Sequence, residues 1–133
     1  MVITGMLTVS NPKMDDERRT ISSFESAEGS FEVGHFIIKQ TTTAPLGNHY
    51  HRWKTETFLI LEGSGSLTYA NVVEVDGKPA YSGELTILPL SPGTVVHILP
   101  YTAHAFHLRE GSLMVCWSSK PYDGQDQPTF KIV

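Results

Sequence analysis

Turn-forming residues interrupt this chain at short intervals, and the segments between them are rich in β-branched and aromatic residues. The clearest turn is Asp76-Gly77, because its second residue tolerates positive φ and so favours a hairpin turn. It separates two apolar segments, 67–75 and 79–88, which are therefore expected to form neighbouring antiparallel strands. No segment of the sequence shows a convincing helical periodicity of apolar residues. This pattern limits the fold to the all-β class, as a sandwich or a closed barrel.

The remaining segments follow the same pattern. Further strands are expected over residues 3–9, 20–24, 31–42, 57–61, 94–99, 103–108 and 112–118. Turns are expected at Glu28-Gly29-Ser30, Glu62-Gly63-Ser64-Gly65 and Glu110-Gly111. A length of 133 residues suits one domain, 1–133, which can bury a hydrophobic core without disulfide bonds. The single cysteine, Cys116, lies in an apolar run and is expected to pack in that core.

Composition and charge argue against two classes of partner. The chain has 10 Lys and Arg against 14 Asp and Glu, a net charge of -4, so no basic patch for nucleic acid is expected. No segment approaches the ~20 apolar residues that a membrane-spanning helix needs. The N-terminal residues 1–9 are apolar but lack a basic leader, so we expect a cytoplasmic protein without membrane contact.

Residues 47–56 bring two imidazoles and one carboxylate close together in the sequence. Side chains alternate between the two faces of an extended segment, so His49 and His51 point the same way and Tyr50 points the opposite way. Glu56 opens the next strand, and a short turn can return its carboxylate to the histidines. A metal ion would still need a fourth ligand. The best candidate is His104, which enters another strand just after a proline-containing turn.

Three imidazoles and one carboxylate suit one divalent transition metal, Fe, Mn, Ni, Co or Zn, and contain too much nitrogen for calcium or magnesium. A His-x-His pair in a strand is also often an ordinary surface or hydrogen-bonded pair, so the metal hypothesis depends on the surrounding turns and on the carboxylate. The other histidines give weaker signals. His35 and His97 lie in apolar strands and are expected to be hydrogen-bonded structural residues, and His107 is expected to face away from His104.

These residues resemble the first sequence motif of the cupin family, which here reads Gly47, His49, His51, Glu56 and Gly63. The segment from Gly93 through Pro100 to His104 resembles the second motif. Two departures are visible: Gly47 lies closer to the first histidine than usual, and Tyr101-Thr102 replaces a glycine-containing turn. The resemblance covers about residues 41–118. It implies a double-stranded β-helix, or jelly-roll, cupin barrel with His49, His51, Glu56 and His104 as metal ligands.

A narrower resemblance involves His49-Tyr50-His51, Thr55-Glu56-Thr57-Phe58, the turn before His104 and the segment from Cys116 to Asp123. These stretches are similar to cupins of bacterial surface-polysaccharide synthesis, including the C-terminal half of a capsular sugar reductase/epimerase. The resemblance implies a metal-bearing isomerase or epimerase that acts on a keto sugar, with the cation polarising a carbonyl. It identifies no proton-transfer residue.

Strand alternation also predicts what surrounds the metal. Phe58 and Ile60 share the face of Glu56, and Phe106 shares the face of His104, so these three apolar side chains are expected to line a substrate pocket. All three are equally compatible with simple core packing. Trp53 and Trp117 are expected to pack against the protein rather than to stack on a substrate.

Three function classes remain open at the level of sequence. The first is a metal-dependent enzyme that acts without redox change on a keto sugar or another small oxygenated metabolite. The second is an Fe(II)-dependent dioxygenase that uses the same ligands. The third is a non-catalytic protein that binds a small ligand or uses the metal for structure alone.

A homodimer is the expected assembly, because β-barrels of this size leave sheet edges and apolar faces for a partner to cover. The first strand or the tail 126–133 is expected to be the part that crosses to the partner.

Overall fold

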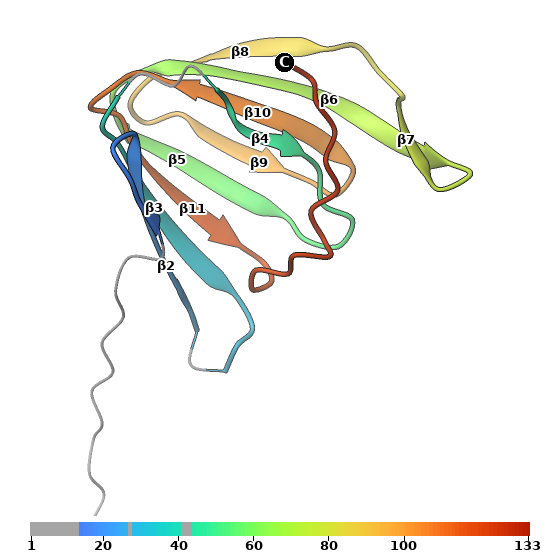
Figure 1. Ribbon diagram of the computed structural model, residues 1–133, viewed down its shortest axis with the longest axis horizontal. Helices are drawn as coiled ribbons and strands as arrows, with labels where there is room; N and C mark the ends of the chain where they lie inside the picture. The colour runs from blue at the N-terminus through green and yellow to red at the C-terminus, as the bar shows by residue number, and fades with distance from the viewer. Residues whose placement is uncertain (1–13, 27, 41–43) are drawn as a thin grey trace, which may run out of the picture.

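The computed structural model describes residues 14–26, 28–40 and 44–133, and this part of the chain contains strands and no helix. The strands lie in two sheets that curl toward each other (Figure 1). Their bounds are β1 Met14–Asp15, β2 Arg19–Glu25, β3 Glu32–Ile38, β4 Leu46–His49, β5 Glu56–Glu62, β6 Gly65–Val75, β7 Lys78–Tyr81, β8 Thr86–Leu90, β9 Val95–Ile98, β10 Thr102–Leu108 and β11 Leu113–Ser118. The all-β prediction is therefore confirmed, while the strand expected over residues 3–9 lies outside the described residues.

The first sheet has the strand order β1-β2-β3-β11-β5-β9. Neighbouring strands in it are antiparallel. The second has the order β4-β10-β6-β7, with β8 also paired to β6. Residues 63 and 64 carry the chain from β5 in the first sheet to β6 in the second, so the expected turn at 62–65 connects the sheets rather than forming a hairpin.

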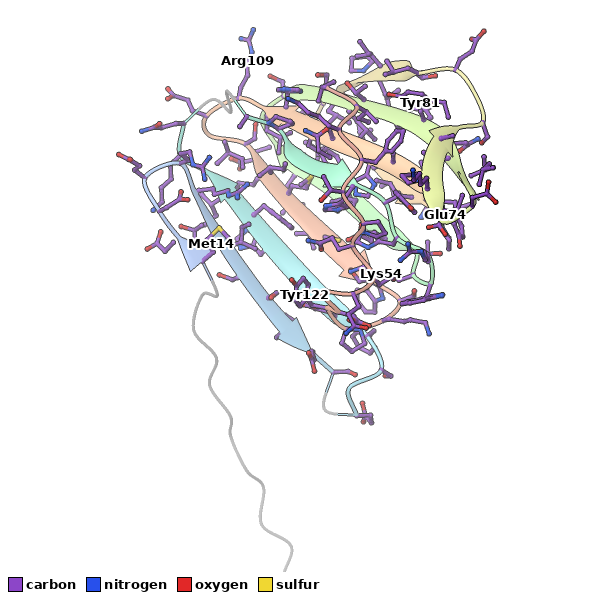
Figure 2. The ribbon with its side chains drawn as sticks, turned by 45° about the vertical axis from the view of Figure 1, so that its right-hand side comes forward. Met14, Lys54, Glu74, Tyr81, Arg109 and Tyr122 are labelled. Carbon is purple, nitrogen blue, oxygen red and sulfur yellow. The ribbon has the colours of Figure 1, made fainter. Side chains whose placement is uncertain are left out.

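The turn Asp76-Gly77 joins β6 to β7 as a two-residue hairpin. Asp76 has φ 52° and Gly77 has φ 74°, and Val75 pairs with Lys78 across the turn. These angles match the expected hairpin chemistry. The hairpin extends beyond the body of the sheets, with Glu74 and Tyr81 on the side of the molecule away from Met14 (Figure 2).

The prediction of one continuous strand over residues 79–88 is wrong. Residues 82–85 interrupt it, so that β7 pairs with residues 72–75 of β6 and β8 pairs with residues 65–69 of the same strand. Both short strands therefore use one long partner. The break includes Gly83, a residue that weakens a strand interior because it has no side chain to pack.

Two apolar clusters hold the sheets together. The larger cluster contains Ile60, Phe106 and Met114 and fills the space between the two sheets. The smaller contains Tyr50, Val72, Ala103 and Ala105, and Ile132 of the C-terminal tail belongs to it. Because Ala103 and Ala105 alternate with His104 and Phe106 along β10, the smaller cluster lies on the opposite face of the second sheet.

The C-terminal tail covers this opposite face by folding back on its own chain. Thr129 forms an isolated bridge with His49, the Tyr50 amide donates to the carbonyl of Pro128, and the Phe130 amide donates to the carbonyl of Asn48. These hydrogen bonds join the tail to β4 of its own chain, and the expectation that residues 126–133 cross to a partner stays a prediction.

Gly47 occupies a position that a side chain cannot share. Its φ is +111°, and an added Cβ would lie 2.5 Å from the carbonyl oxygen of His104 on the neighbouring strand. We therefore expect Gly47→Ala to lower the free energy of unfolding by ~3 kcal/mol, from backbone strain and separation of β4 from β10. Urea unfolding measures the change. Gly29→Ala is the matched control, because Gly29 also has positive φ but an added Cβ there meets nothing within 4 Å, so an equal loss in both variants would contradict the role of close packing.

Candidate metal centre

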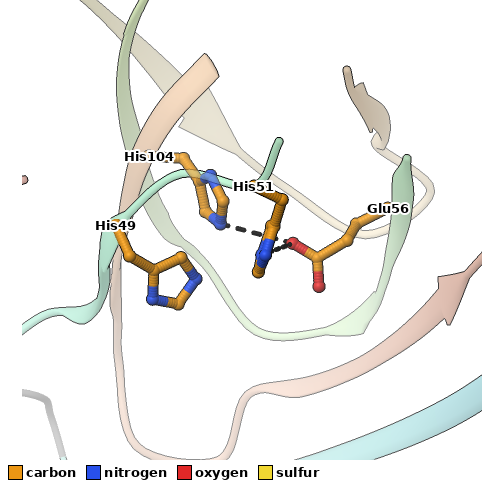
Figure 3. A group of neighbouring side chains, drawn as sticks. All are labelled: His49, His51, Glu56 and His104. Carbon is orange, nitrogen blue, oxygen red and sulfur yellow. Dashed lines mark ion pairs between the residues drawn. The ribbon is translucent and has the colours of Figure 1, made fainter. Parts of the chain in front are cut away.

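Four predicted side chains converge between the sheets, as Figure 3 shows. His49 ends β4 and pairs with His104 of β10, while Glu56 opens β5 and His51 lies in the connection between β4 and β5. One potential ligand atom from each of the four residues lies within 4.8 Å of the others. The structure thus brings together all four residues proposed from the sequence as a group that could hold a metal ion.

Alternation along residues 49–51 separates the two histidines from the residue between them. Tyr50 is fully buried in the cluster beneath the tail, and its hydroxyl donates to Glu74 Oε1 at 2.6 Å. The Tyr101 amide donates to the carbonyl of His51 at 2.8 Å. Tyr101 has φ 62°, the left-handed conformation that glycine adopts most easily, so its backbone takes the turn required before β10 despite the departure from the usual cupin glycine.

Hydrogen bonds orient two of the imidazoles. Nδ1 of His51 lies 2.5 Å from the carbonyl oxygen of Asp126, and Nδ1 of His104 lies 3.0 Å from the carbonyl oxygen of Thr102. Since a carbonyl oxygen only accepts, each Nδ1–H group donates and each Nε2 keeps a lone pair. Both Nε2 atoms point toward Glu56 Oε1, at 2.9 Å from His51 and 3.4 Å from His104.

This arrangement leaves lone pairs facing one another in a buried site. Among the described residues, His51 Nε2 and Glu56 Oε1 are buried atoms without a hydrogen-bond partner. Unpartnered buried polar atoms are costly, and a cation bound between them would satisfy both. The donor set of three imidazoles and one carboxylate therefore fits a divalent transition metal.

The charge states of the site also suit a cation. Burial acts to raise the pKa of the Glu56 carboxyl, but in the metal-free protein its close contacts with the rings of His104 and His51 outweigh burial and hold that pKa well below 4.5. Burial, assisted by nearby His104 and His51, lowers the pKa of His49 to about 3. At neutral pH Glu56 is ionised and His49 is neutral, the forms in which each binds metal.

A cavity of about 550 Å³ opens beside the cluster, and His49, Glu56 and His104 form part of its wall. Phe58 and Phe106 line the same cavity, with their ring centroids 4.7 Å apart. Ile60 instead packs within the larger apolar cluster and is not among the residues that line the cavity. Ile60 points inward, as strand alternation predicted. The cavity does not extend as far as Ile60, so its prediction as a pocket residue is not met.

The residues with weaker sequence signals lie away from the cluster. His97 is exposed on β9, where its Nδ1 lies 2.9 Å from the hydroxyl of Thr57. His107 lines a separate surface pocket with Ser66 and Arg109. Trp53 is 56% exposed, so the expectation that it packs against the protein is not met, whereas the Trp117 ring stacks on Phe31 with centroids 4.7 Å apart.

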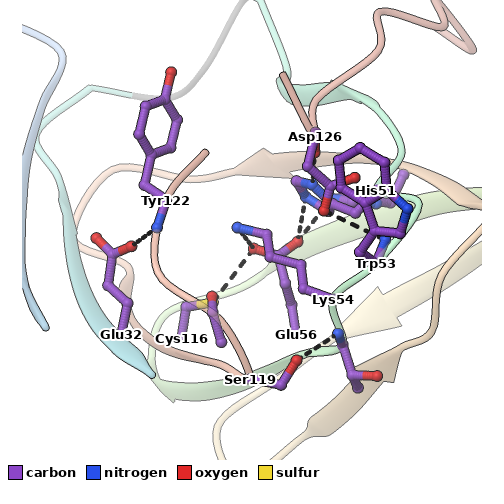
Figure 4. Close-up of polar contacts among 12 residues, drawn as sticks. Glu32, His51, Trp53, Lys54, Glu56, Cys116, Ser119, Tyr122 and Asp126 are labelled. Carbon is purple, nitrogen blue, oxygen red and sulfur yellow. Dashed lines mark hydrogen bonds and ion pairs between the residues drawn. The ribbon is translucent and has the colours of Figure 1, made fainter. Parts of the chain in front are cut away.

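Several polar residues of the cavity wall were missed from the sequence. Lys54 is buried, and its Nζ lies 3.8 Å from Glu56 Oε2 (Figure 4). Glu32 accepts a hydrogen bond from the Tyr122 amide at 2.6 Å, and both residues line the cavity together with Arg19. Cys116 is buried as expected, but it also lines the cavity, and burial together with the Glu56 charge raises the pKa of its thiol. Lys54 precedes Glu56 by two residues, and side chains two apart in an extended segment point to the same face. This spacing could have predicted from the sequence that Lys54 points inward.

Asp126 in the tail contacts His51 and the two residues that follow it. Its carbonyl oxygen accepts from His51, and its buried carboxylate accepts from the amides of Arg52 and Trp53 at 2.6 and 3.3 Å. We expect Asp126→Ala to lower the free energy of unfolding by ~2 kcal/mol and metal affinity by ~10-fold or more, because loss of the carboxylate releases the tail and with it the Asp126 carbonyl that orients His51. Competition with a coloured chelator measures the affinity. Asp123→Ala, which removes a carboxylate bonded only to the nearby Gln125 amide, is the control and should leave affinity unchanged.

Comparison with known proteins adds the fold family. No protein-family model and no curated protein matches the sequence. Among solved structures, the capsular polysaccharide assembling protein CapF from Staphylococcus aureus is 20% identical with a TM-score of 0.72, and the match covers 92% of this chain and 32% of CapF. This chain thus spans about a third of the CapF chain.

Two further matches extend over most of both chains. Ectoine synthase from P. lautus is 18% identical with a TM-score of 0.59, covering 94% of this chain and 82% of that one. Streptomyces PAC13, in a structure with uridine, is 12% identical with a TM-score of 0.63, covering 97% and 94%. The part of our chain that the structure describes has no helix long and apolar enough to cross a membrane. The neighbours are cupin jelly-roll proteins, and the chain therefore has the cupin fold.

Proposed function

We propose that this protein is a metal-dependent enzyme that acts on a keto sugar or another small oxygenated metabolite, in an isomerase- or epimerase-type reaction without net redox change. The observation that carries the proposal is the position of the four donors. Three of them, His49, Glu56 and His104, form part of the wall of an open cavity rather than a closed shell. A metal held at the edge of a cavity keeps positions for substrate, as catalytic sites do.

In this proposal His49, His51, Glu56 and His104 hold one divalent ion. The bound ion supplies a Lewis acid that polarises a carbonyl oxygen. Lys54 contacts the second oxygen of Glu56 and so orients the carboxylate with Oε1 toward the histidines. Lys54 also lines the cavity beside the cluster, and its ammonium group is our candidate for moving a proton at the substrate. Phe58 and Phe106 exclude water on the side of His104.

The test is hydrogen exchange at the carbon next to a carbonyl. Protein loaded separately with Fe(II), Mn, Ni, Co or Zn is incubated in D2O with a panel of keto sugars, and NMR follows deuterium incorporation. We expect incorporation by wild type and by His107→Ala, and none by His104→Ala. Oxygen consumption with Fe(II), without exchange, would instead favour a dioxygenase. Metal and ligand binding without either reaction would favour a non-catalytic binding protein.

The homodimer and the cytoplasmic location expected from the sequence remain predictions. A single subunit of 14.7 kDa by light scattering would rule out the homodimer under those conditions.

A further inference from the structure

Side chains on the inner face of the first sheet lie in successive rows across the strands, and these rows form the floor of the cavity. Pairing places Glu56, Ser118 and Glu32 in one row across β5, β11 and β3. The next inward row along the strands contains Phe58, Cys116, Gly34 and Ser23. Because the last three are small, this row leaves room above the sheet. The third row contains Met114, Phe36 and Ile21, which bound the room with apolar side chains.

Arg19 lies at the end of the cavity floor that is opposite the candidate metal centre. It pairs with Ile38 and lies on the same face of β2 as Ile21 and Ser23, and these three side chains line the cavity. Met14 of β1 pairs with Ile21 at this end, whereas Lys54 and Tyr122 lie toward the other (Figure 2). The cavity therefore has a carboxylate-bearing end with Glu32 and Glu56, and a guanidinium-bearing end.

Within the described part of the chain, the Arg19 side chain forms no ion pair with an acidic residue. Its Nε is buried without a hydrogen-bond partner, and the ion pairs among the described residues do not include it. The two nearest acids along the chain are already paired on the outer side: Asp16 contacts the Arg18 guanidinium at 3.3 Å, and Asp15 contacts Lys39 at 2.5 Å. Lys54, the other cavity cation, is beside Glu56. Arg19 is thus the cavity cation that takes part in no ion pair among the described residues.

We propose that Arg19 binds the acid group of an elongated, partly apolar organic anion, with the oxygenated end of that molecule directed toward the metal centre. This deepens the proposed function and rests on it for the position of the reacting end. Guanidinium groups bind carboxylates and phosphates through paired N–H groups.

The dimensions support an elongated molecule. Arg19 and Glu25 mark the two ends of β2, six residues apart, so roughly 20 Å of strand separates them. A compact two-carbon or three-carbon acid cannot contact Arg19 and also approach the cluster. The apolar row of Ile21, Phe36 and Met114 lies between the polar ends and matches a hydrocarbon chain or ring. A volume of about 550 Å³ falls within the range of small-molecule sites.

Binding of three six-carbon probes tests the assignment. Calorimetry compares hexanoate, hexyl phosphate and hexanol on wild type, Arg19→Gln, Arg19→Lys and Arg18→Gln, with metal content measured in every sample. We expect at least one anion to bind wild type ten-fold or more tightly than hexanol. Arg19→Gln should abolish that preference without changing hexanol affinity or metal content. Whichever anion binds more tightly identifies the acid group as carboxylate or phosphate.

Arg18→Gln is the matched control, since it removes the same charge from an adjacent, exposed position. It should retain the preference, and Arg19→Lys should retain part of it. Three outcomes overturn the proposal: wild type shows no preference for either anion, the preference survives Arg19→Gln, or Arg18→Gln reduces it equally. If Arg19→Gln is unfolded by circular dichroism, Arg19→Lys decides, and an unchanged preference then overturns the assignment. Failure of the metal site appears separately, as absent metal or absent exchange with the Arg19 effect intact.

Discussion

The His104→Ala variant is expected to bind its divalent metal ~100-fold to 1,000-fold more weakly than wild type. Structural zinc sites with four protein ligands have apparent binding free energies of ~10–16 kcal/mol, and on that scale one ligand accounts for roughly 3–4 kcal/mol. His104 is buried, its Nε2 faces Glu56, and its Nδ1 is fixed by the carbonyl of Thr102. Removal of this imidazole leaves a gap that water can fill only in part.

Inductively coupled plasma mass spectrometry on untagged protein, purified without chelators, measures the effect. About one equivalent of metal is expected in wild type and less than a tenth in the variant after dialysis. His107→Ala is the matched control because it removes an imidazole from the same strand but outside the cluster. Circular dichroism establishes that both variants fold. Equal metal content in folded His104→Ala and wild type would show that His104 is not a ligand.

The sequence was sufficient for features that depend on local rules. Asp76-Gly77 forms the expected hairpin because turn chemistry acts over two residues. Strand parity separated His49 and His51 from Tyr50, and it placed Phe58 and Phe106 beside the cluster. His104 was a candidate from its position after a proline-containing turn and from the resemblance to cupins, but no local rule fixes its convergence with the other three, because 47 residues lie between Glu56 and His104.

Features that depend on long-range pairing could not be read in the same way. Arg19 and Glu32 face the cavity because β2, β3 and β11 are neighbours in one sheet, and local periodicity does not specify this order. The tail pairs with β4 for the same kind of reason: residues 128–130 find the open edge of a strand about 80 residues earlier. The break between β7 and β8 follows from β6 being long enough to serve both.

Acidification is expected to destabilise the metal-free protein in two successive pH ranges. The pKa of His49 is lowered from 6.5 to about 3, chiefly by burial and then by His104 and His51. Between these values the unfolded chain binds a proton that the folded protein excludes, so the free energy of unfolding falls as pH decreases. One proton corresponds to ~1.4 kcal/mol per pH unit, and because the unfolded histidine is only half protonated at pH 6.5, the loss from pH 6.5 to 4.5 is ~2 kcal/mol.

Glu56 acts in the same direction but at lower pH. Its depressed pKa gives a stabilisation that is complete above 4.5 and is lost as pH falls toward the folded-state pKa. The range above 4.5 therefore isolates the contribution of His49. Urea unfolding in the presence of chelator at pH 6.5, 5.5 and 4.5 should give a distinctly shallower pH dependence for His49→Gln than for wild type. His107→Gln supplies the control, with the same substitution outside the cluster.

The comparison of slopes, rather than of absolute stabilities, decides the result. His49→Gln changes packing beside His51 and His104, whose ring centroids both lie 4.8 Å from that of His49, and this shifts the curve at every pH. Only loss of the titrating group changes the slope. Parallel curves for wild type and His49→Gln would mean that His49 gains no protons on unfolding in this range. Parallel curves would therefore refute the neutral, partly buried imidazole on which the candidate metal centre depends.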